Sequence, residues 1–159
     1  MRAVVLHPHP DMGGTRHDPV VTTLARALVG AHTFDFVSSD PRRAVDQTLT
    51  ELGDGSVWLA GYSFGGGIAS LIDDPRVRGW ILVAPALAMV APVIATDTRP
   101  KLVLAAERDA FFPPASLREL TAGWAATTHH EIAGADHFLR GHERDVAARA
   151  AAWVLQFAP

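Results

Sequence analysis

The chain has 159 residues and a formal net charge of −3, which favours one folded domain and gives no electrostatic reason to expect nucleic acid or an anionic membrane as a partner. It contains no cysteine, so disulfides, thiolate metal sites and a cysteine nucleophile are excluded. No apolar run approaches the ~20 residues that a membrane-spanning helix needs, and the opening MRAVVLHPHP lacks the pattern of a secretory signal, so we expect a soluble, cytoplasmic protein.

Six short apolar runs alternate with helical patterns along the chain. The expected strands are residues 3–7, 33–38, 56–62, 79–84, 101–106 and 129–133. The expected helices are residues 17–30, 40–52, 63–72, 113–124 and 142–157. This alternation predicts right-handed crossovers and a parallel sheet with helices on both faces, a three-layer α/β/α sandwich. In such sheets the site lies beyond the carboxyl ends of the strands, so the residues that follow each apolar run are the candidates.

The third apolar run leads directly into Gly61-Tyr62-Ser63-Phe64-Gly65, a G-x-S-x-G pattern. A strand that joins a helix without a loop forces the serine into a strained backbone conformation, and side chains at Gly61 or Gly65 would collide with neighbouring backbone. Ser63 Oγ would then project above the sheet at a helix N-terminus, as in a nucleophile elbow. The alternative is a glycine-rich turn that only lets strand and helix pack closely.

Two further polar residues follow the fifth and sixth apolar runs. Asp109 lies in AAERDAFFPP and His137 lies in AGADHFLRGH. The chain order Ser63, acid, histidine is the order that this type of elbow uses, so we assign nucleophile, acid and base in that order. Asp109 could instead be a turn residue or cap before Pro113, and His137 an ordinary loop histidine. Other carboxylates that compete for the acid role are Asp97 and Glu107; Asp136 is expected to point away.

The loop after the first strand reads His7-Pro8-His9-Pro10-Asp11, an H-x-H-x-D spacing that could hold a metal ion. In one class of zinc hydrolase another histidine follows, whereas here the next residue is Met12. No complete tetrahedral ligand set can be assembled from spacing, so we expect no metal. A metal-dependent hydrolase that uses His7 and His9 is the less favoured alternative.

The same loop can serve catalysis through its backbone. Attack on a carbonyl carbon places negative charge on oxygen, which needs two preorganised N–H donors. One donor is expected from Phe64, the residue after the nucleophile, and the other from this loop. Prolines have no N–H, so His9 is the only donor between its two prolines, while Gly13 and Gly14 let the chain turn back. We assign the oxyanion hole to His9 and Phe64, and expect His7 to be a packing residue with a hydrogen bond.

These motifs resemble those of the α/β-hydrolases, and most of all the small bacterial dienelactone-hydrolase-like group with an HPHP..GGT loop. The similar segments are LHPHPDMGGT, LAGYSFGGGIA, AAERDAFFPP and GADHFL, in this order, and they span nearly the whole chain. The resemblance implies an α/β-hydrolase fold in which Ser63 is the nucleophile, Asp109 the acid and His137 the base. The chain departs from the group in a trimmed, about six-stranded sheet and in a shorter connection after the second strand.

The sequence thus predicts a serine hydrolase that cleaves a carboxylic ester or related acyl bond of a small molecule without a cofactor. The alternative from another class is a catalytically weak scaffold that keeps the fold. Residues 85–100 are too few for a large lid, and a shortened sheet would leave an edge on which two copies could pair. The residues expected to bind substrate are Met12, Tyr62, Phe111, Phe112 and Phe138. Phe64, Met89 and Leu139 are also expected near the mouth of the site.

Overall fold

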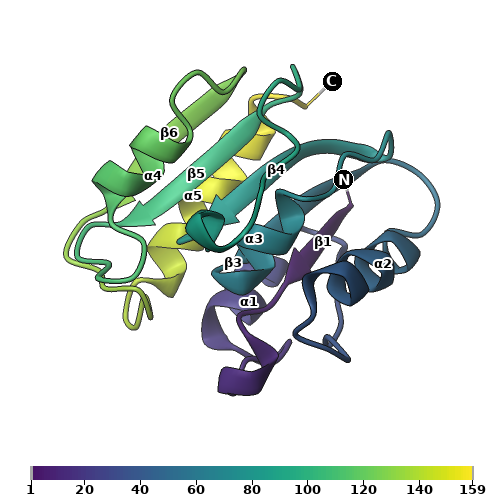
Figure 1. Cartoon of the computed structure of the whole chain (residues 1–159), viewed down its shortest axis with the longest axis horizontal. Helices are drawn as coiled ribbons and strands as arrows, with labels where there is room; N and C mark the ends of the chain where they lie inside the picture. Colours follow the sequence, from purple (N-terminus) through teal and green to yellow (C-terminus); the bar gives the residue numbers. More distant parts are fainter. Residues whose placement is uncertain (1, 159) are drawn as a thin grey trace.

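The fold is a parallel sheet covered by helices on both faces, as the computed structural model shows for residues 2–158 (Figure 1). Six strands pair in the order β2-β1-β3-β4-β5-β6, and every pairing is parallel. Their bounds are β1 Ala3–Leu6, β2 Ala31–Thr33, β3 Val57–Tyr62, β4 Val77–Val83, β5 Lys101–Ala106 and β6 Thr127–Ile132. The predicted trimmed, six-stranded parallel sheet is therefore confirmed.

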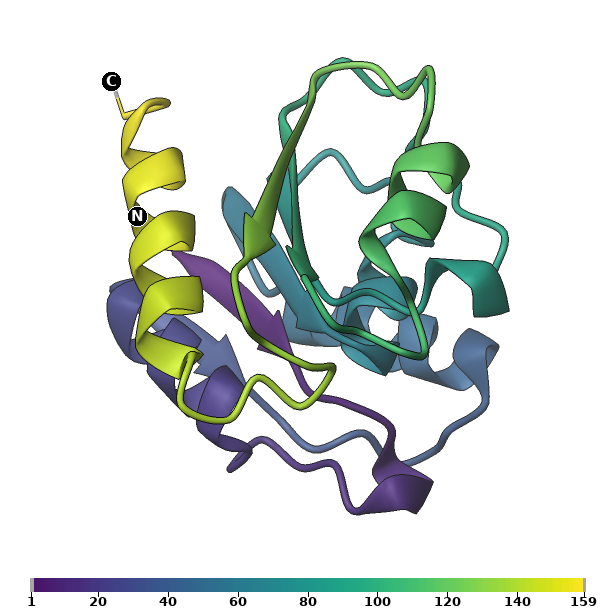
Figure 2. The same cartoon turned by 90° about the vertical axis from the view of Figure 1, so that its left-hand side faces the viewer.

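Five α-helices form the outer layers. Their bounds are α1 Pro19–Ala27, α2 Pro41–Glu51, α3 Phe64–Ala69, α4 Pro114–Leu120 and α5 Glu143–Leu155. α1 and α5 pack together on one face, and α2, α3 and α4 cover the other, which Figure 2 shows along the sheet. No helix in residues 2–158 is long and apolar enough to cross a membrane.

Helix starts follow the sequence signals closely. The side chain of Asp18 accepts hydrogen bonds from the first main-chain N–H groups of α1, and Asp40 does the same for α2. In both helices a proline occupies the first position, where its missing N–H removes no hydrogen bond. These caps fix where each helix begins after the preceding loop.

The second strand differs from its prediction, because β2 covers only Ala31–Thr33 and residues 34–38 form no strand. After Thr33, main-chain N–H groups donate to side chains instead of to a neighbouring strand. The N–H of Phe36 donates to Nε2 of His7 at 2.8 Å, and the N–H of Val37 donates to Oε1 of Gln47 at 3.0 Å. The apolar pattern read as strand instead reflects two aromatic side chains that are buried against the sheet, Phe34 and Phe36.

α4 is also shorter than predicted. It ends at Leu120, and Gly123 then adopts a φ of 80°, a left-handed conformation that does not continue a helix. Within α4, Leu117 is buried and Leu120 is exposed. The helical spacing of Trp124 therefore overestimated the length of this helix.

The amino ends of the strands carry the one lysine of the sequence, Lys101, fully buried at the start of β5. Its Nζ donates to the carbonyl oxygens of Asp97, of Arg99 at 3.0 Å and of Ala125 at 2.9 Å. The Arg99 guanidinium lies 4.6 Å from the centre of the Trp80 ring and pairs with Asp97. Three carbonyl partners satisfy the three donors of the ammonium group, which explains how this end of the sheet tolerates a buried cation.

Candidate active site

Ser63 stands at a sharp junction between β3 and α3. Its backbone has φ 53° and ψ −113°, a strained conformation for a residue with a side chain. A Cβ on Gly61 would lie 2.2 Å from the carbonyl oxygen of Gly65, and a Cβ on Gly65 would lie 2.5 Å from that of Leu6. The predicted collisions are confirmed, because only glycine permits the tight turn that presents Ser63 at the carboxyl end of the sheet.

A chain of hydrogen bonds joins Ser63, at the junction of β3 and α3, to His137 and Asp109, which lie in the loops after β6 and β5. The distance from Ser63 Oγ to His137 Nε2 is 2.9 Å, and that from His137 Nδ1 to Asp109 Oδ2 is 2.7 Å. When the neutral imidazole carries its proton on Nδ1, it donates to the carboxylate and leaves Nε2 to accept from the serine hydroxyl. All three side chains are largely buried, so the chain is shielded from competing water.

The Asp109 carboxylate is held on both of its oxygens. While Oδ2 faces His137, Oδ1 accepts hydrogen bonds from the N–H groups of Phe111 and Phe112, at 2.9 and 2.8 Å. Burial alone would raise the pKa of Asp109, but the hydrogen bonds from His137 and from the two main-chain groups outweigh it and lower the pKa. The carboxyl group is therefore ionised at neutral pH.

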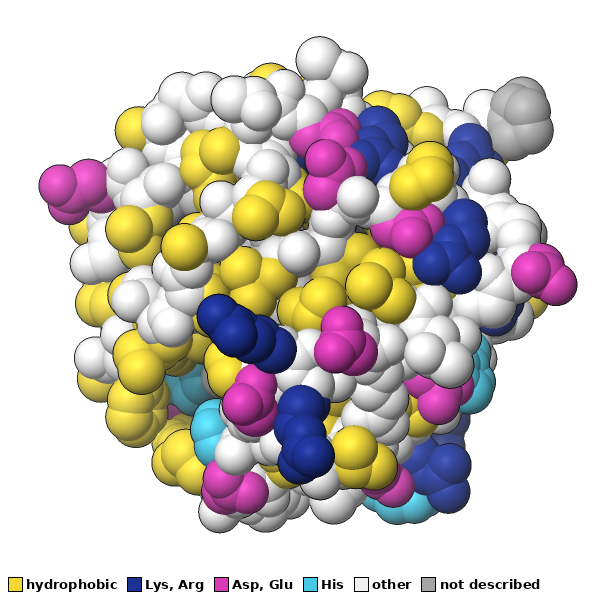
Figure 3. All heavy atoms as spheres, turned by 45° about the vertical axis from the view of Figure 1, so that its right-hand side comes forward, with side chains coloured by type: hydrophobic (Ala, Val, Ile, Leu, Met, Phe, Trp, Pro, Cys, Tyr) yellow, Lys and Arg dark blue, Asp and Glu magenta, His cyan; other side chains and the backbone are white. Residues whose placement is uncertain are grey.

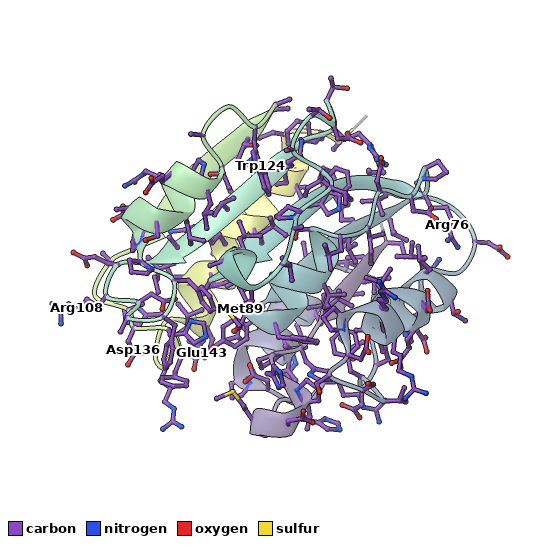
Figure 4. The ribbon with its side chains drawn as sticks, in the orientation of Figure 1. Arg76, Met89, Arg108, Trp124, Asp136 and Glu143 are labelled. Atoms are coloured by element: carbon purple, nitrogen blue, oxygen red, sulfur yellow. The ribbon has the colours of Figure 1, made fainter. Side chains whose placement is uncertain are left out.

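The other carboxylates that compete for the acid role have partners elsewhere. Asp97 pairs with Arg99 before β5, at the opposite end of that strand. Glu107 accepts from the N–H of Gly134, which ties the loop after β5 to the loop after β6. Figure 4 shows Asp136 at the edge of the molecule formed by these loops. It is exposed and accepts from the N–H of Phe138.

Tyr62 lies beneath the His137 loop. Its hydroxyl donates to the carbonyl oxygen of His137 at 2.8 Å, and the residue is only 3% exposed. Burial raises the pKa of this hydroxyl, so it stays protonated and remains a donor at neutral pH. The sequence predicted Tyr62 as a pocket residue, and no pattern in it pointed to this link between β3 and the loop that carries His137.

The loop after β1 passes close to Ser63. His9 precedes a short 3-10 helix, Pro10–Met12, and its ring centre lies 4.9 Å from that of Phe64 in an edge-on arrangement. Gly14 lets the loop close on itself, because a Cβ there would lie 2.2 Å from the carbonyl oxygen of Pro8. Within residues 2–158, the main-chain N–H groups of His9 and Phe64 donate to no other residue. Two main-chain donors without a partner thus belong to two residues whose rings are in contact.

His7 is engaged within the protein. Its Nδ1 lies 2.6 Å from the carbonyl oxygen of Pro8, and its Nε2 accepts from the N–H of Phe36. Burial lowers the pKa of this imidazole, in keeping with a neutral ring that has one donor and one acceptor. No three histidine, aspartate or glutamate residues of the described chain lie together in a way that could hold a metal ion. His7 and His9 therefore do not form the ligand set considered from their spacing.

Aromatic side chains surround the His137 ring. The ring centres of Phe111, Phe112 and Phe138 lie 5.2, 5.5 and 5.7 Å from it. In Figure 3, hydrophobic side chains gather around a hollow in which histidine is visible. Met12 is 81% exposed on the loop after β1.

Two other residues expected near the mouth differ in exposure. Figure 4 shows Met89 between the centre of the fold and the edge that carries Asp136. The side chain of Met89 is exposed. Leu139, by contrast, is buried in the core and does not reach the mouth.

No family model matches the chain, and no curated protein matches it. Solved structures do match it over nearly its whole length. An α/β serine hydrolase homologue from Coxiella burnetii is 25% identical, with 97% of this chain and 85% of that chain covered and a TM-score of 0.79. A lidless α/β serine hydrolase from Xanthomonas campestris is 22% identical, with coverages of 99% and 82% and a TM-score of 0.73. Est1E from Butyrivibrio proteoclasticus, with ferulic acid bound, is 13% identical, with coverages of 98% and 88% and a TM-score of 0.80.

The lidless neighbour from Xanthomonas campestris agrees with the short connection after β4. Residues 85–100 contain only a 3-10 helix, Leu87–Met89, where a lid would otherwise be inserted. The chain therefore has the α/β-hydrolase fold, in a form without a lid, and is similar to serine hydrolases of that fold.

Proposed function

We propose that this protein is a serine hydrolase that cleaves a carboxylic ester, with Ser63 as nucleophile, His137 as general base and Asp109 as its orienting acid. The observation that carries the proposal is the hydrogen-bonded chain from Ser63 Oγ through the imidazole to the buried carboxylate. Similarity to serine hydrolases and to an esterase domain from Rhodothermus marinus supports the same chemistry.

In the first half of the reaction, Ser63 Oγ attacks the ester carbonyl carbon while its proton passes to His137 Nε2. The carbonyl oxygen becomes an oxyanion, which the N–H groups of His9 and Phe64 would stabilise because they have no other partner. The carbon–oxygen bond to the alcohol then breaks, and His137 returns the proton to the departing alcohol oxygen. The product is an acyl group on Ser63.

In the second half, a water molecule attacks the acyl carbon and gives its proton to His137 Nε2. The same oxyanion site is used again, and collapse of the intermediate returns the proton to Ser63 Oγ and releases the acid. The Asp109 carboxylate holds the ring with Nδ1 protonated and stabilises the imidazolium that forms in each half. Every step uses side chains and main-chain groups of this chain alone.

The proposal is tested by labelling the purified protein with a fluorophosphonate probe and by assaying short-chain acyl esters. We expect covalent labelling at Ser63, and a loss of esterase turnover of about 10⁶-fold in Ser63→Ala. Asp136→Asn, an exposed change beside His137, is the matched control and should label like the unchanged protein. Absence of labelling in a folded protein, or undiminished turnover in Ser63→Ala, would favour a scaffold with the fold but without the chemistry.

A further inference from the structure

Two phenylalanine side chains stand exposed beside the His137 ring. Phe111 is 59% exposed and Phe138 is 55% exposed, and their ring centres lie 6.2 Å apart in an edge-to-face arrangement. Phe112 differs from both, because it packs against the core while they belong to neither core cluster. Large apolar side chains that lie in water without supporting the core commonly mark a binding surface.

The proposed reaction fixes which part of an ester would meet these rings. His137 Nε2 returns its proton to the alcohol oxygen, so that oxygen must come within hydrogen-bond reach of the ring. The carbonyl oxygen is drawn instead toward the N–H groups of His9 and Phe64. The alcohol part therefore lies on the His137 side of Ser63, and the acyl part lies away from it.

A hollow in the surface borders Phe138. Phe138 lines a hollow of about 450 Å³ together with Pro19, Val20 and Tyr62, at the start of α1 and the end of β3. Three polar side chains, Asp18, Arg140 and Glu143, form the rest of its wall. Phe138 therefore contacts the His137 ring on one side and borders this hollow on the other, and its ring is accessible from solvent.

From these contacts we infer that Phe111 and Phe138 form the binding site for the alcohol part of the ester and select alcohols that carry an aromatic group. The inference rests on the proposed function and adds the side of the substrate on which the selection is made. An aromatic ring on the alcohol would stack on, or meet edge-on, the two exposed rings as it is released. The same ring placed on the acyl part would point away from them.

Three esters separate an aromatic ring on the alcohol part from one on the acyl part. Benzyl acetate carries the ring on the alcohol, ethyl phenylacetate carries it on the acyl part, and ethyl acetate has none. kcat/KM is measured for each with the unchanged protein, Phe111→Ala, Phe138→Ala and Leu155→Ala. Leu155 is an exposed apolar residue at the far end of α5 and serves as the matched control. Ratios of kcat/KM between two esters cancel the intrinsic reactivity of each ester when the variants are compared.

We expect the ratio of benzyl acetate to ethyl acetate to fall about two- to tenfold in each phenylalanine variant, as loss of one aromatic contact implies. In Leu155→Ala this ratio should equal that of the unchanged protein, and Phe138→Trp should restore it. The ratio of ethyl phenylacetate to ethyl acetate should not follow the same pattern. Phe111→Ala retains the main-chain N–H that donates to Asp109. If either alanine variant unfolds, Phe111→Leu or Phe138→Leu repeats the test.

Unchanged benzyl ratios in both phenylalanine variants would overturn the inference, as would an effect confined to ethyl phenylacetate. Either result, with Ser63 still labelled and the esters still hydrolysed, leaves the proposed function in place. A protein that hydrolyses none of the three esters and resists the probe would instead reject the proposed function itself.

Discussion

Asp109 shows how much of a site can depend on a single turn. Its carboxylate accepts hydrogen bonds from the main-chain N–H groups of Phe111 and Phe112 and from the His137 ring. The turn both orients the acid and compensates for its burial, so that it stays charged where an isolated carboxylate would not. The position of Asp109 after a strand could be predicted from the sequence, because the carboxyl ends of parallel strands lie at the same edge of the sheet.

Asp109→Asn should lower kcat for any ester about 10⁴-fold while the protein stays folded. The amide can still accept from Phe111 and Phe112, but its NH₂ faces Nδ1 and favours the tautomer that places the ring proton on Nε2, where it blocks the serine. Steady-state kinetics on one ester, with thermal unfolding as the check on structure, measures this. A fall of less than tenfold would remove Asp109 from the proposed triad.

What could not be predicted at this scale is the contact from Tyr62 to the main chain of His137. A hydroxyl that bonds to a carbonyl 75 residues away leaves no local pattern, because any residue can supply the carbonyl. Tyr62→Phe keeps the ring and deletes only the donor, so we expect a lower melting temperature and a lower kcat as the loop loosens. A melting curve and kcat both equal to those of the unchanged protein would show that the hydrogen bond has no role.

At the scale of elements, the site is built where strand ends meet loops of fixed shape. Helix starts with an Asp-Pro pair were predictable, since capping and proline geometry are local. The extent of β2 was not, because the side chains of His7 and Gln47 take hydrogen bonds that a longer strand would have used. Such competition between side chains and the ladder depends on tertiary placement, which apolar periodicity does not record.

Gly14 provides a test of the loop after β1 as an element. In Gly14→Ala the new Cβ collides with the carbonyl oxygen of Pro8, so the loop must shift and the His9 N–H moves with it. We expect kcat to fall about 10²–10³-fold, the cost of losing one oxyanion donor, with a much smaller change in KM. Gly55→Ala is the control. Alanine is strained there because φ is 84°, but its Cβ meets no other atom, so the change affects stability without moving the loop after β1. If both variants lower kcat equally, the effect is one of general stability.

At the scale of the whole molecule, the two ends of the sheet differ: the amino end carries ion pairs, and the carboxyl end carries the candidate active site. Figure 4 shows Arg76 far from the edge that holds Arg108 and Asp136. At the amino end, hydrogen bonds from Arg76 lower the pKa of Asp74 to about 2, and hydrogen bonds from Arg99 do the same for Asp97. Ion pairs thus fasten the end of the sheet that is remote from the site, while the opposite end keeps exposed aromatic residues.

These ion pairs predict how stability responds to acid. A carboxyl group with a lowered pKa in the folded state contributes stability above its unfolded pKa of about 3.8 and loses it as the pH falls towards 2. Asp97→Asn should therefore unfold at lower urea than the unchanged protein at pH 6, and the difference should shrink between pH 4 and pH 2. Urea midpoints across this range measure it, and a difference independent of pH would contradict the assignment.

Because the only side-chain amine of the sequence is enclosed by three carbonyl groups at the start of β5, amine-directed reagents have no lysine to modify while the sheet is intact. Acetylation of residue 101 would require β5 to separate from its surroundings. The yield of that adduct under increasing denaturant therefore reports directly on opening of the central sheet, without an engineered probe.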